Sequence, residues 1–123
     1  MASVSRIPFR IVLTGFGVVG GEFIRFLAPR TVDKLLLALP FEGRASLWRD
    51  EVYFEVPVRV GGEKSVATVT SGTVAYWPMA RAFCIFFGDT KPYSPVNRVG
   101  AIRGNLELFQ RVTSGTRIRV ERE

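Results

Sequence analysis

Short stretches with apolar residues at every second position run along most of this chain, separated by glycine, proline, serine or threonine. In the first of them, Phe9, Ile11 and Leu13 hold the alternate positions. Successive side chains of a strand point to opposite faces of its sheet, so this spacing is typical of strands that bury one face. Because the stretches are short and turn residues separate them, the pattern predicts an antiparallel sheet or barrel.

The clearest of these segments, at residues 52–58, places Val52 and Phe54 on one face of a strand. Its other face carries Glu51, Tyr53 and Glu55. We expect about eight strands in all, at residues 9–14, 18–27, 52–58, 65–70, 73–77, 82–87, 98–103 and 117–121.

Two segments have helical spacing instead. Residues 31–39 place apolar side chains at i, i+3, i+4 and i+7, while Pro29 suits a first helical turn and Pro40 stops the helix. A second helix, at residues 105–112, would start with Asn105 as its N-cap, and Gly115 lies beyond it where a left-handed residue is favoured. The sequence therefore predicts a mainly β fold, a closed antiparallel barrel with two short capping helices, in one domain over residues 1–123.

The charge of the chain is positive but scattered. Seventeen Lys and Arg residues against 11 Asp and Glu give a net charge of +6, and nearly all the cations are arginine. A nucleic-acid surface needs a denser basic stripe with exposed aromatic residues, so we expect no nucleic-acid partner. Surface ion pairs are the better prediction, and the arginine bias is similar to that of thermophile proteins.

Other compositional features limit location and chemistry. No apolar run approaches the ~20 residues of a membrane-spanning helix, and residues 1–10 lack the pattern of a signal peptide, so we expect a cytoplasmic protein without a membrane partner. Cys84 is the single cysteine and lies in an apolar run, which indicates a buried structural thiol. With no histidine and one cysteine, only a carboxylate-bound hard cation stays open as a metal, and we expect none.

The glycines Gly15, Gly17 and Gly20 match the spacing of a dinucleotide-binding loop after a strand-like run. The context differs, because only residues 22–28 remain before Pro29, too few for a crossover helix. A glycine-rich hairpin with positive φ at its turn is the better prediction, and we expect no cofactor.

Two blocks carry a resemblance to a known family. Residues 27–58 read LAPRTVDKLLLALPFEGRASLWRDEVYFEVPV, and residues 72–121 contain GTVAYWP, RAFCIFFG, PYSPVN and VGAIRGNLELFQRVTSGTRIRVE. In this order they resemble the small cyclophilin-like proteins of unknown function from archaea and bacteria. The resemblance implies a closed antiparallel barrel with a helix at each open end.

Cyclophilins isomerise X–Pro bonds, whose barrier is ~20 kcal/mol, with an arginine beside an apolar proline pocket. The resemblance places Phe86 and Phe87 at the pocket phenylalanine and Tyr93 at the pocket tryptophan. Asn97 falls where cyclophilins carry a histidine. The resemblance therefore implies a cleft of the cyclophilin type with a changed set of catalytic groups.

Arg44 and Arg49 are the candidates for the catalytic arginine, although neither lies in the aromatic–His–Arg setting of the family. If they line the cleft, at least one should approach Glu42, Glu51 or Asn97. The reason is that a guanidinium in a partly desolvated cleft needs acceptors for its planar set of donors.

The clustered carboxylates are Glu42, Asp50, Glu51 and Glu55, and they leave two interpretations open. Glu51 and Glu55 can share a strand face, and paired carboxylates perform acid–base chemistry when one is buried. Alternatively, the four carboxylates pair with Arg44, Arg49 and Arg59 on neighbouring strands.

Tyrosine and tryptophan favour rims and pockets, because each has an apolar ring with a polar tip. The chain has two tryptophans and three tyrosines. With the residues that the resemblance points to, the candidate ligand cleft comprises Arg44, Trp48, Arg49, Glu51, Tyr53, Tyr76, Trp77, Phe86, Phe87, Tyr93 and Asn97.

Three functions follow as hypotheses. The first is a non-enzymatic binding module that takes a peptide or small molecule in the cyclophilin-like cleft. The second is a weak or altered peptidyl-prolyl isomerase that uses Arg44 or Arg49. The third, an NAD(P)-binding fragment, requires a parallel sheet.

Overall fold

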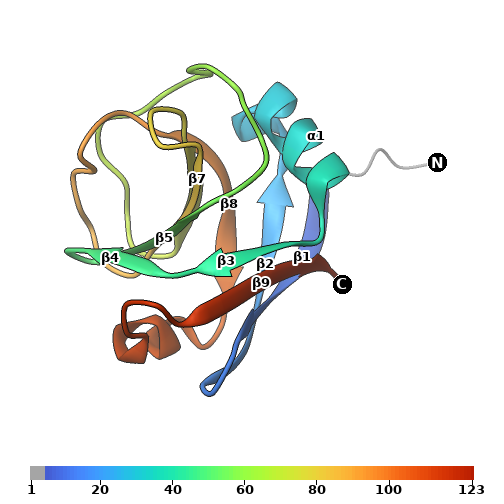
Figure 1. Cartoon of the computed structure of the whole chain (residues 1–123). Coiled ribbons are helices and arrows are strands. Elements are labelled where there is room, and N and C mark those ends of the chain that lie inside the picture. Colours follow the sequence, from blue (N-terminus) through green and yellow to red (C-terminus); the bar gives the residue numbers. More distant parts are fainter. Residues whose placement is uncertain (1–4) are drawn as a thin grey trace.

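The computed structural model describes residues 5–123 and shows one antiparallel sheet rolled into a nearly closed barrel (Figure 1). Residues 1–4, part of the segment considered above for a signal peptide, lie outside the described residues. The sheet has nine strands, in the order β3-β9-β1-β2-β8-β6-β7-β5-β4. They are β1 (Arg6–Leu13), β2 (Gly17–Ile24), β3 (Phe41–Arg44), β4 (Ser46–Trp48), β5 (Glu51–Glu55), β6 (Thr73–Trp77), β7 (Ala82–Phe86), β8 (Asn97–Arg103) and β9 (Arg117–Arg122).

The two edge strands of this sheet, β3 and β4, are consecutive in the chain and only Ala45 separates them. β3 pairs with β9 and β4 pairs with β5, so one continuous stretch of chain closes the barrel. Backbone bonds fix the crossing point, since Ala45 N–H donates to Thr116 O at 2.8 Å and Gly115 N–H donates to Ala45 O at 2.8 Å. The mainly β antiparallel barrel predicted from the sequence is confirmed.

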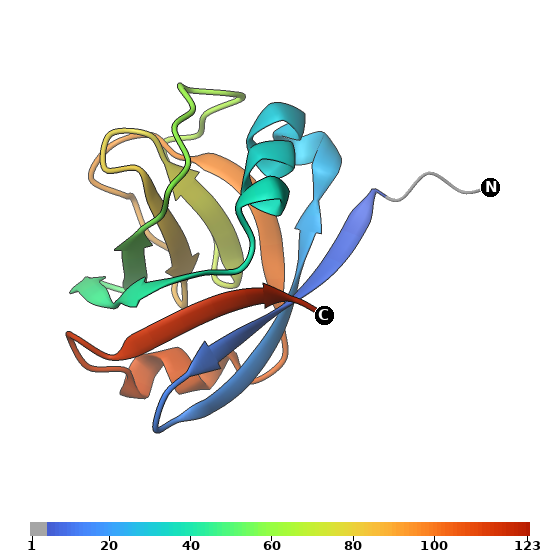
Figure 2. The same ribbon diagram turned by 45° about the vertical axis from the view of Figure 1, so that its right-hand side comes forward.

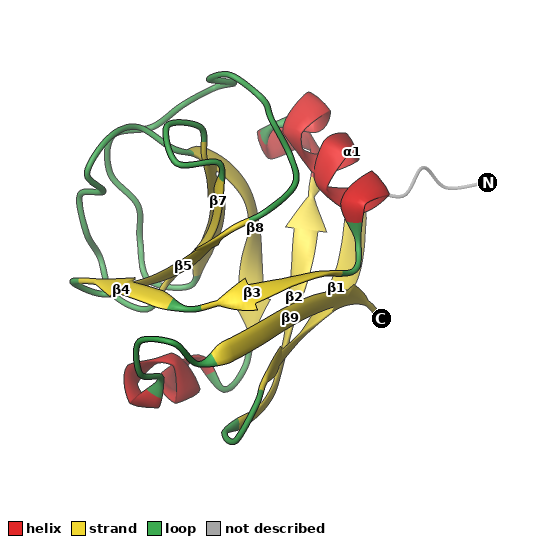
Figure 3. Ribbon diagram, viewed as in Figure 1, coloured by secondary structure: helices red, strands yellow, loops and turns green. Residues whose placement is uncertain are grey.

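The strand count differs from the expected eight in two places. β3 and β4 were not predicted, because their sequence, FEGR and SLW, has too few alternating apolar residues. Residues 65–70, expected as a strand, form only the isolated bridges Val66–Val96 and Val69–Thr90. They belong to a long loop between β5 and β6, and Figure 3 shows this loop and the one after β7 arching beside the barrel.

Helices lie at opposite ends of the barrel (Figure 2). The α-helix α1 (Pro29–Ala38) begins at Pro29 and buries Val32 and Leu35, which confirms the first predicted helix to within two residues at its start. The second is a 3-10 helix, η2 (Leu106–Arg111), whose Phe109 enters the core. Asn105 holds the N-cap position as predicted, but it has a left-handed φ of 54° and its side chain makes no capping bond. A further 3-10 turn, η1 (Arg25–Leu27), replaces the expected end of the second strand.

The Gly15–Gly20 motif forms a hairpin, as predicted. β1 and β2 pair antiparallel from Leu13 opposite Gly17, and Gly15 takes a φ of 89° in the turn. Gly21 follows on β2, where a Cβ atom would come within 2.6 Å of the Phe9 ring. The parallel sheet that a dinucleotide fold requires is replaced by antiparallel pairing, so the third hypothesis loses its structural basis.

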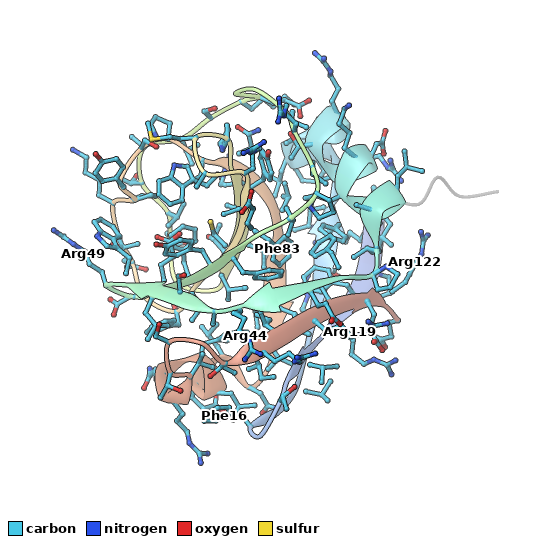
Figure 4. The ribbon with its side chains drawn as sticks, in the orientation of Figure 1. Phe16, Arg44, Arg49, Phe83, Arg119 and Arg122 are labelled. Carbon is cyan, nitrogen blue, oxygen red and sulfur yellow. The ribbon has the colours of Figure 1, made fainter. Side chains whose placement is uncertain are left out.

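The barrel interior is an aromatic core centred on Phe83 (Figure 4). This ring is fully buried, and its centroid lies 5.4–6.3 Å from four other phenylalanine rings. Those rings belong to Phe9, Phe23, Phe41 and Phe54.

A second, smaller core lies on the opposite face of β5, β6 and β7. The register explains the division, since Tyr53 pairs with Cys84 and Cys84 with Ala75, whereas Val52 pairs with Ile85 inside the barrel. The side chains on this outer face pack against residues of the long loops that follow β5 and β7. The second core consists of Val69, Ala75, Ala82, Cys84, Phe86 and Val96. Cys84 is fully buried, as expected for a structural thiol.

Arginine–carboxylate ion pairs lie on the surface of the barrel, which confirms the predicted surface ion pairs. Glu22 binds both Arg6 and Arg103, and Glu121 binds both Arg10 and Arg119. Within residues 5–123, no helix is long and apolar enough to cross a membrane.

Candidate functional site

A pocket of 220 Å³ opens on the outer face of the sheet, above the second core. Trp48 of β4, Glu51 and Tyr53 of β5, Trp77 of β6 and Tyr93 of the loop before β8 line it. We call these five residues the aromatic pocket. All five were among the candidates predicted from the sequence.

The strand register explains why these side chains meet. Trp48 pairs directly with Glu51 across β4 and β5, and Tyr53 follows two residues later on the same face. The positions beside Tyr53 and Trp77 on β7 hold the small residues Cys84 and Ala82. Small residues on the neighbouring strand leave room above the sheet, and the larger rings surround that space.

Trp77 is the central ring of the pocket. Its centroid lies 5.6 Å from that of Tyr53 at an interplanar angle of 78°, and 6.1 Å from that of Tyr93 at 60°. Edge-to-face pairs of this kind are favourable, because the positive edge of one ring meets the negative face of the other. The indole N–H of Trp77 donates to Ser94 Oγ at 2.6 Å, which ties the ring to the loop that carries Tyr93.

Tyr93 lies at the pocket mouth. It remains 70% exposed despite its contact with Trp77, and the neighbouring Met79 is 67% exposed. Met79 accepts a weak hydrogen bond from Ser94 through its sulfur at 3.8 Å. Ser94 therefore connects two large exposed side chains, Met79 through this bond and Tyr93 as its neighbour in the chain.

Glu51 is the one ionisable side chain buried in the pocket wall, with 3% of its surface exposed. Burial raises the pKa of its carboxyl group above the ordinary value of 4.5, against a smaller opposing effect of its hydrogen bond with the Cys84 thiol. Burial and the nearby Glu51 in turn raise the pKa of Cys84 well above its ordinary value. Among the described residues 5–123, Glu51 has no ion-pair partner.

Glu51→Gln is expected to change how stability depends on pH. A raised folded-state pKa means that the wild-type contribution is present below pH 4.5 and lost as pH rises through the folded pKa. Glutamine cannot ionise, so the variant should match the wild type near pH 4 and be the more stable protein at pH 8. Urea unfolding of both proteins at each pH measures the difference, and the comparison cancels titrations common to both. A difference that is constant with pH would contradict the raised pKa.

Three of the other candidates are packed into the cores. Tyr76 is fully buried, and its hydroxyl donates to Val58 O at 2.6 Å. Phe86 belongs to the second core, and Phe87 packs against the main core. None of the three is among the residues that line the aromatic pocket.

Asn97 is the centre of a buried polar network away from the aromatic pocket. Its Oδ1 accepts hydrogen bonds from Glu63 N–H and Ser65 Oγ, both at 2.9 Å. Its Nδ2 donates to Thr31 Oγ1 at 3.1 Å and to Gly61 O at 3.0 Å. The side chain thus uses two acceptor and two donor positions to hold the β5–β6 loop against the start of α1, which indicates a structural role.

Glu63 completes this network as the cap of α1. Its carboxylate accepts from the backbone N–H groups of Arg30 and Thr31 at 3.0 and 2.8 Å, and from Thr31 Oγ1 at 2.7 Å. Burial acts to raise the pKa of Glu63, but these hydrogen bonds outweigh it and the pKa is lowered. A carboxylate from a distant loop therefore satisfies the helix N-terminus in place of a local cap.

The two candidate arginines lie outside the aromatic pocket. Arg44 lines a neighbouring depression of 380 Å³ that shares Tyr53, and its Nη1 donates to Gly115 O at 3.2 Å. Arg49 stacks on Trp48 with its Cζ 4.8 Å from the ring centroid, and it extends away from the barrel beyond β4 (Figure 4). The expected approach to Glu42, Glu51 or Asn97 is wrong, since neither arginine forms a hydrogen bond or ion pair with them.

The proposed pairing of the clustered carboxylates with Arg44, Arg49 and Arg59 is also wrong. Glu55 lies 3.8 Å from Arg81 instead. Ser94, which positions the Trp77 ring, was not predicted, because a serine in a proline-rich loop carries no signal of such a contact. Residues 5–123 contain no group of three or more side chains suited to hold a metal ion.

Known proteins agree with this architecture. A sequence model of the Cyclophilin-like family matches residues 9–121, and the chain belongs to that family. The hypothetical protein AF2241 from Archaeoglobus fulgidus, solved in solution, is 35% identical with a TM-score of 0.82, and the match covers 97% of this chain and 96% of that one. The family predicted from the sequence motifs is thus confirmed.

A more distant neighbour is McbB, whose structure was solved in complex with tryptophan. It is 14% identical with a TM-score of 0.78, and the match covers 94% of this chain but 44% of the McbB chain. Similarity at this level of identity shows a shared fold alone. No curated protein matches the sequence.

Proposed function

We propose that this protein is a binding module that takes a small molecule, or a single side chain of a peptide, in the aromatic pocket. The observation that carries this proposal is the convergence of four aromatic rings and a buried acid around an open space of 220 Å³. Drug-sized ligands occupy roughly 300–1,000 Å³, so the pocket suits something smaller. Apolar walls with a few placed polar groups are the usual composition of such sites.

A divergent prolyl isomerase is the alternative, and its support is Arg44 in the depression beside the pocket. The guanidinium already donates to Gly115 O, and no arginine lines the aromatic pocket itself. A protease-coupled isomerisation assay separates the two functions. We expect rates equal to the uncatalysed reaction, whereas acceleration that Arg44→Ala abolishes would establish the enzyme.

Tyr93→Ala is the variant that separates binding from folding. Tyr93 is mostly exposed and loses only its edge-to-face contact with Trp77, so the change should lower the free energy of unfolding by no more than about 1 kcal/mol. The same change removes one wall of the pocket and should weaken ligand affinity about tenfold, the scale of one aromatic contact. Phe26→Ala is the matched control, because Phe26 is an exposed aromatic residue that does not line the pocket.

The assay is a thermal-shift screen followed by calorimetry. A ligand that binds the native state raises the melting temperature by mass action. The panel contains proline-containing peptides, small amines and free amino acids, with tryptophan included because McbB was solved with it. A panel without any hit, or a hit that Tyr93→Ala and Phe26→Ala affect equally, would count against the proposal.

A further inference from the structure

Glu51 is the one acidic side chain among the five residues of the aromatic pocket. We propose that the ligand carries an alkylated ammonium group, which sits against the ring faces with Glu51 as its counter-charge. This inference rests on the proposed function and narrows it to organic cations.

The rings provide the first argument. The faces of aromatic rings are negative and attract a cation within about 6 Å of the centroid, most strongly for tryptophan. Two tryptophans and two tyrosines surround this pocket. One ring already holds a cation, because the guanidinium of Arg49 lies 4.8 Å from the centroid of Trp48.

Charge provides the second argument. Glu22, Glu42, Glu55, Glu121 and Asp33 each pair with arginine at the surface. Glu51 differs from them, since it is buried and has no cationic partner among residues 5–123. A buried carboxylate is costly unless a partner neutralises it, and a cation in the pocket would be that partner.

The chemistry of the walls selects the kind of cation. A primary ammonium is strongly hydrated and needs acceptors for three N–H donors, whereas this pocket offers one carboxyl group and mostly ring carbon. An alkylated ammonium needs fewer acceptors or none and contacts ring faces through its methyl groups. The net charge of +6 gives no general attraction for cations, so the recognition is local.

Choline and its uncharged carbon isostere, 3,3-dimethylbutan-1-ol, test this inference, because they share a shape and differ in charge. We expect wild-type protein to bind choline at least tenfold more tightly than the alcohol in an NMR or calorimetric titration. Glu51→Gln should remove that preference. It should lower the affinity for choline at least tenfold and leave the affinity for the alcohol unchanged within about twofold.

Glu55→Gln is the matched control, because Glu55 is on the same strand, is exposed and does not line the pocket. It should leave the preference for choline intact, and amide spectra should show that both variants are folded. Equal binding of the two compounds, or a preference for choline that survives in Glu51→Gln, would overturn the cation inference while leaving a binding pocket. No choline binding at all would also overturn it, and the broader ligand panel then decides the proposed function separately.

Discussion

Asn97→Ala is expected to lower the free energy of unfolding by about 3 kcal/mol or more. The change deletes the four hydrogen bonds of a fully buried side chain. It leaves Glu63 N–H and Gly61 O without these partners, and a buried polar group left unpaired costs about 1–3 kcal/mol. Chemical unfolding followed by circular dichroism measures the loss.

Gln110→Ala is the control for this experiment, because Gln110 is an exposed amide on η2 and should change stability by less than about 0.5 kcal/mol. The same comparison distinguishes the structural role of Asn97 from a role in ligand binding. A stable Asn97→Ala protein that has lost ligand affinity would return Asn97 to the site.

Phe83→Ala is expected to lower the free energy of unfolding by about 4 kcal/mol, within the range for replacing a buried phenylalanine with alanine. Phe83 is fully buried and its ring contacts four others, from β1, β2, β3 and β5. Its loss therefore opens a cavity between strands that lie far apart in the sequence. Thermal and urea unfolding of the variant measure the cost.

Phe83→Leu should cost only about 1.5 kcal/mol, because leucine keeps much of the volume. Phe26→Ala, at an exposed aromatic position, should change stability by less than about 0.5 kcal/mol. If Phe83→Ala lost no more stability than Phe26→Ala, Phe83 would not be the centre of the main core.

The sequence predicted the barrel because its alternation is strong where one face is buried. It failed at residues 41–48, where β3 and β4 are held by their neighbours β9 and β5 rather than by their own apolar pattern. It also failed at residues 65–70, whose valines and threonines favour a strand but which run as a loop that Asn97 and Glu63 hold against α1. Contacts between distant segments decided both cases.

The membership of the pocket was predictable only in part, since five of the eleven candidate residues line it, and its chemistry was not predictable. Tyrosine and tryptophan have amphipathic rings, so the prediction of pocket residues by residue type succeeded for four of the five, whereas Tyr76 is buried in the core. The burial of Glu51 did not, because strand alternation assigns it to the outer face and only the second core shows that this face is covered. The positions of Arg44 and Arg49 depend on the geometry of nearby turns, which the composition does not determine. One example is the φ of 53° at Arg49.

Trp48 and Trp77 are the two tryptophans of the chain, and both line the aromatic pocket. Their indole N–H signals in a ¹H–¹⁵N NMR spectrum therefore report on this pocket alone. During titration with a ligand from the panel, our account predicts that both signals move in a saturable way, together with the backbone amides of Glu51 and Tyr93. Indole signals that stay in place while amides elsewhere on the barrel move would contradict it.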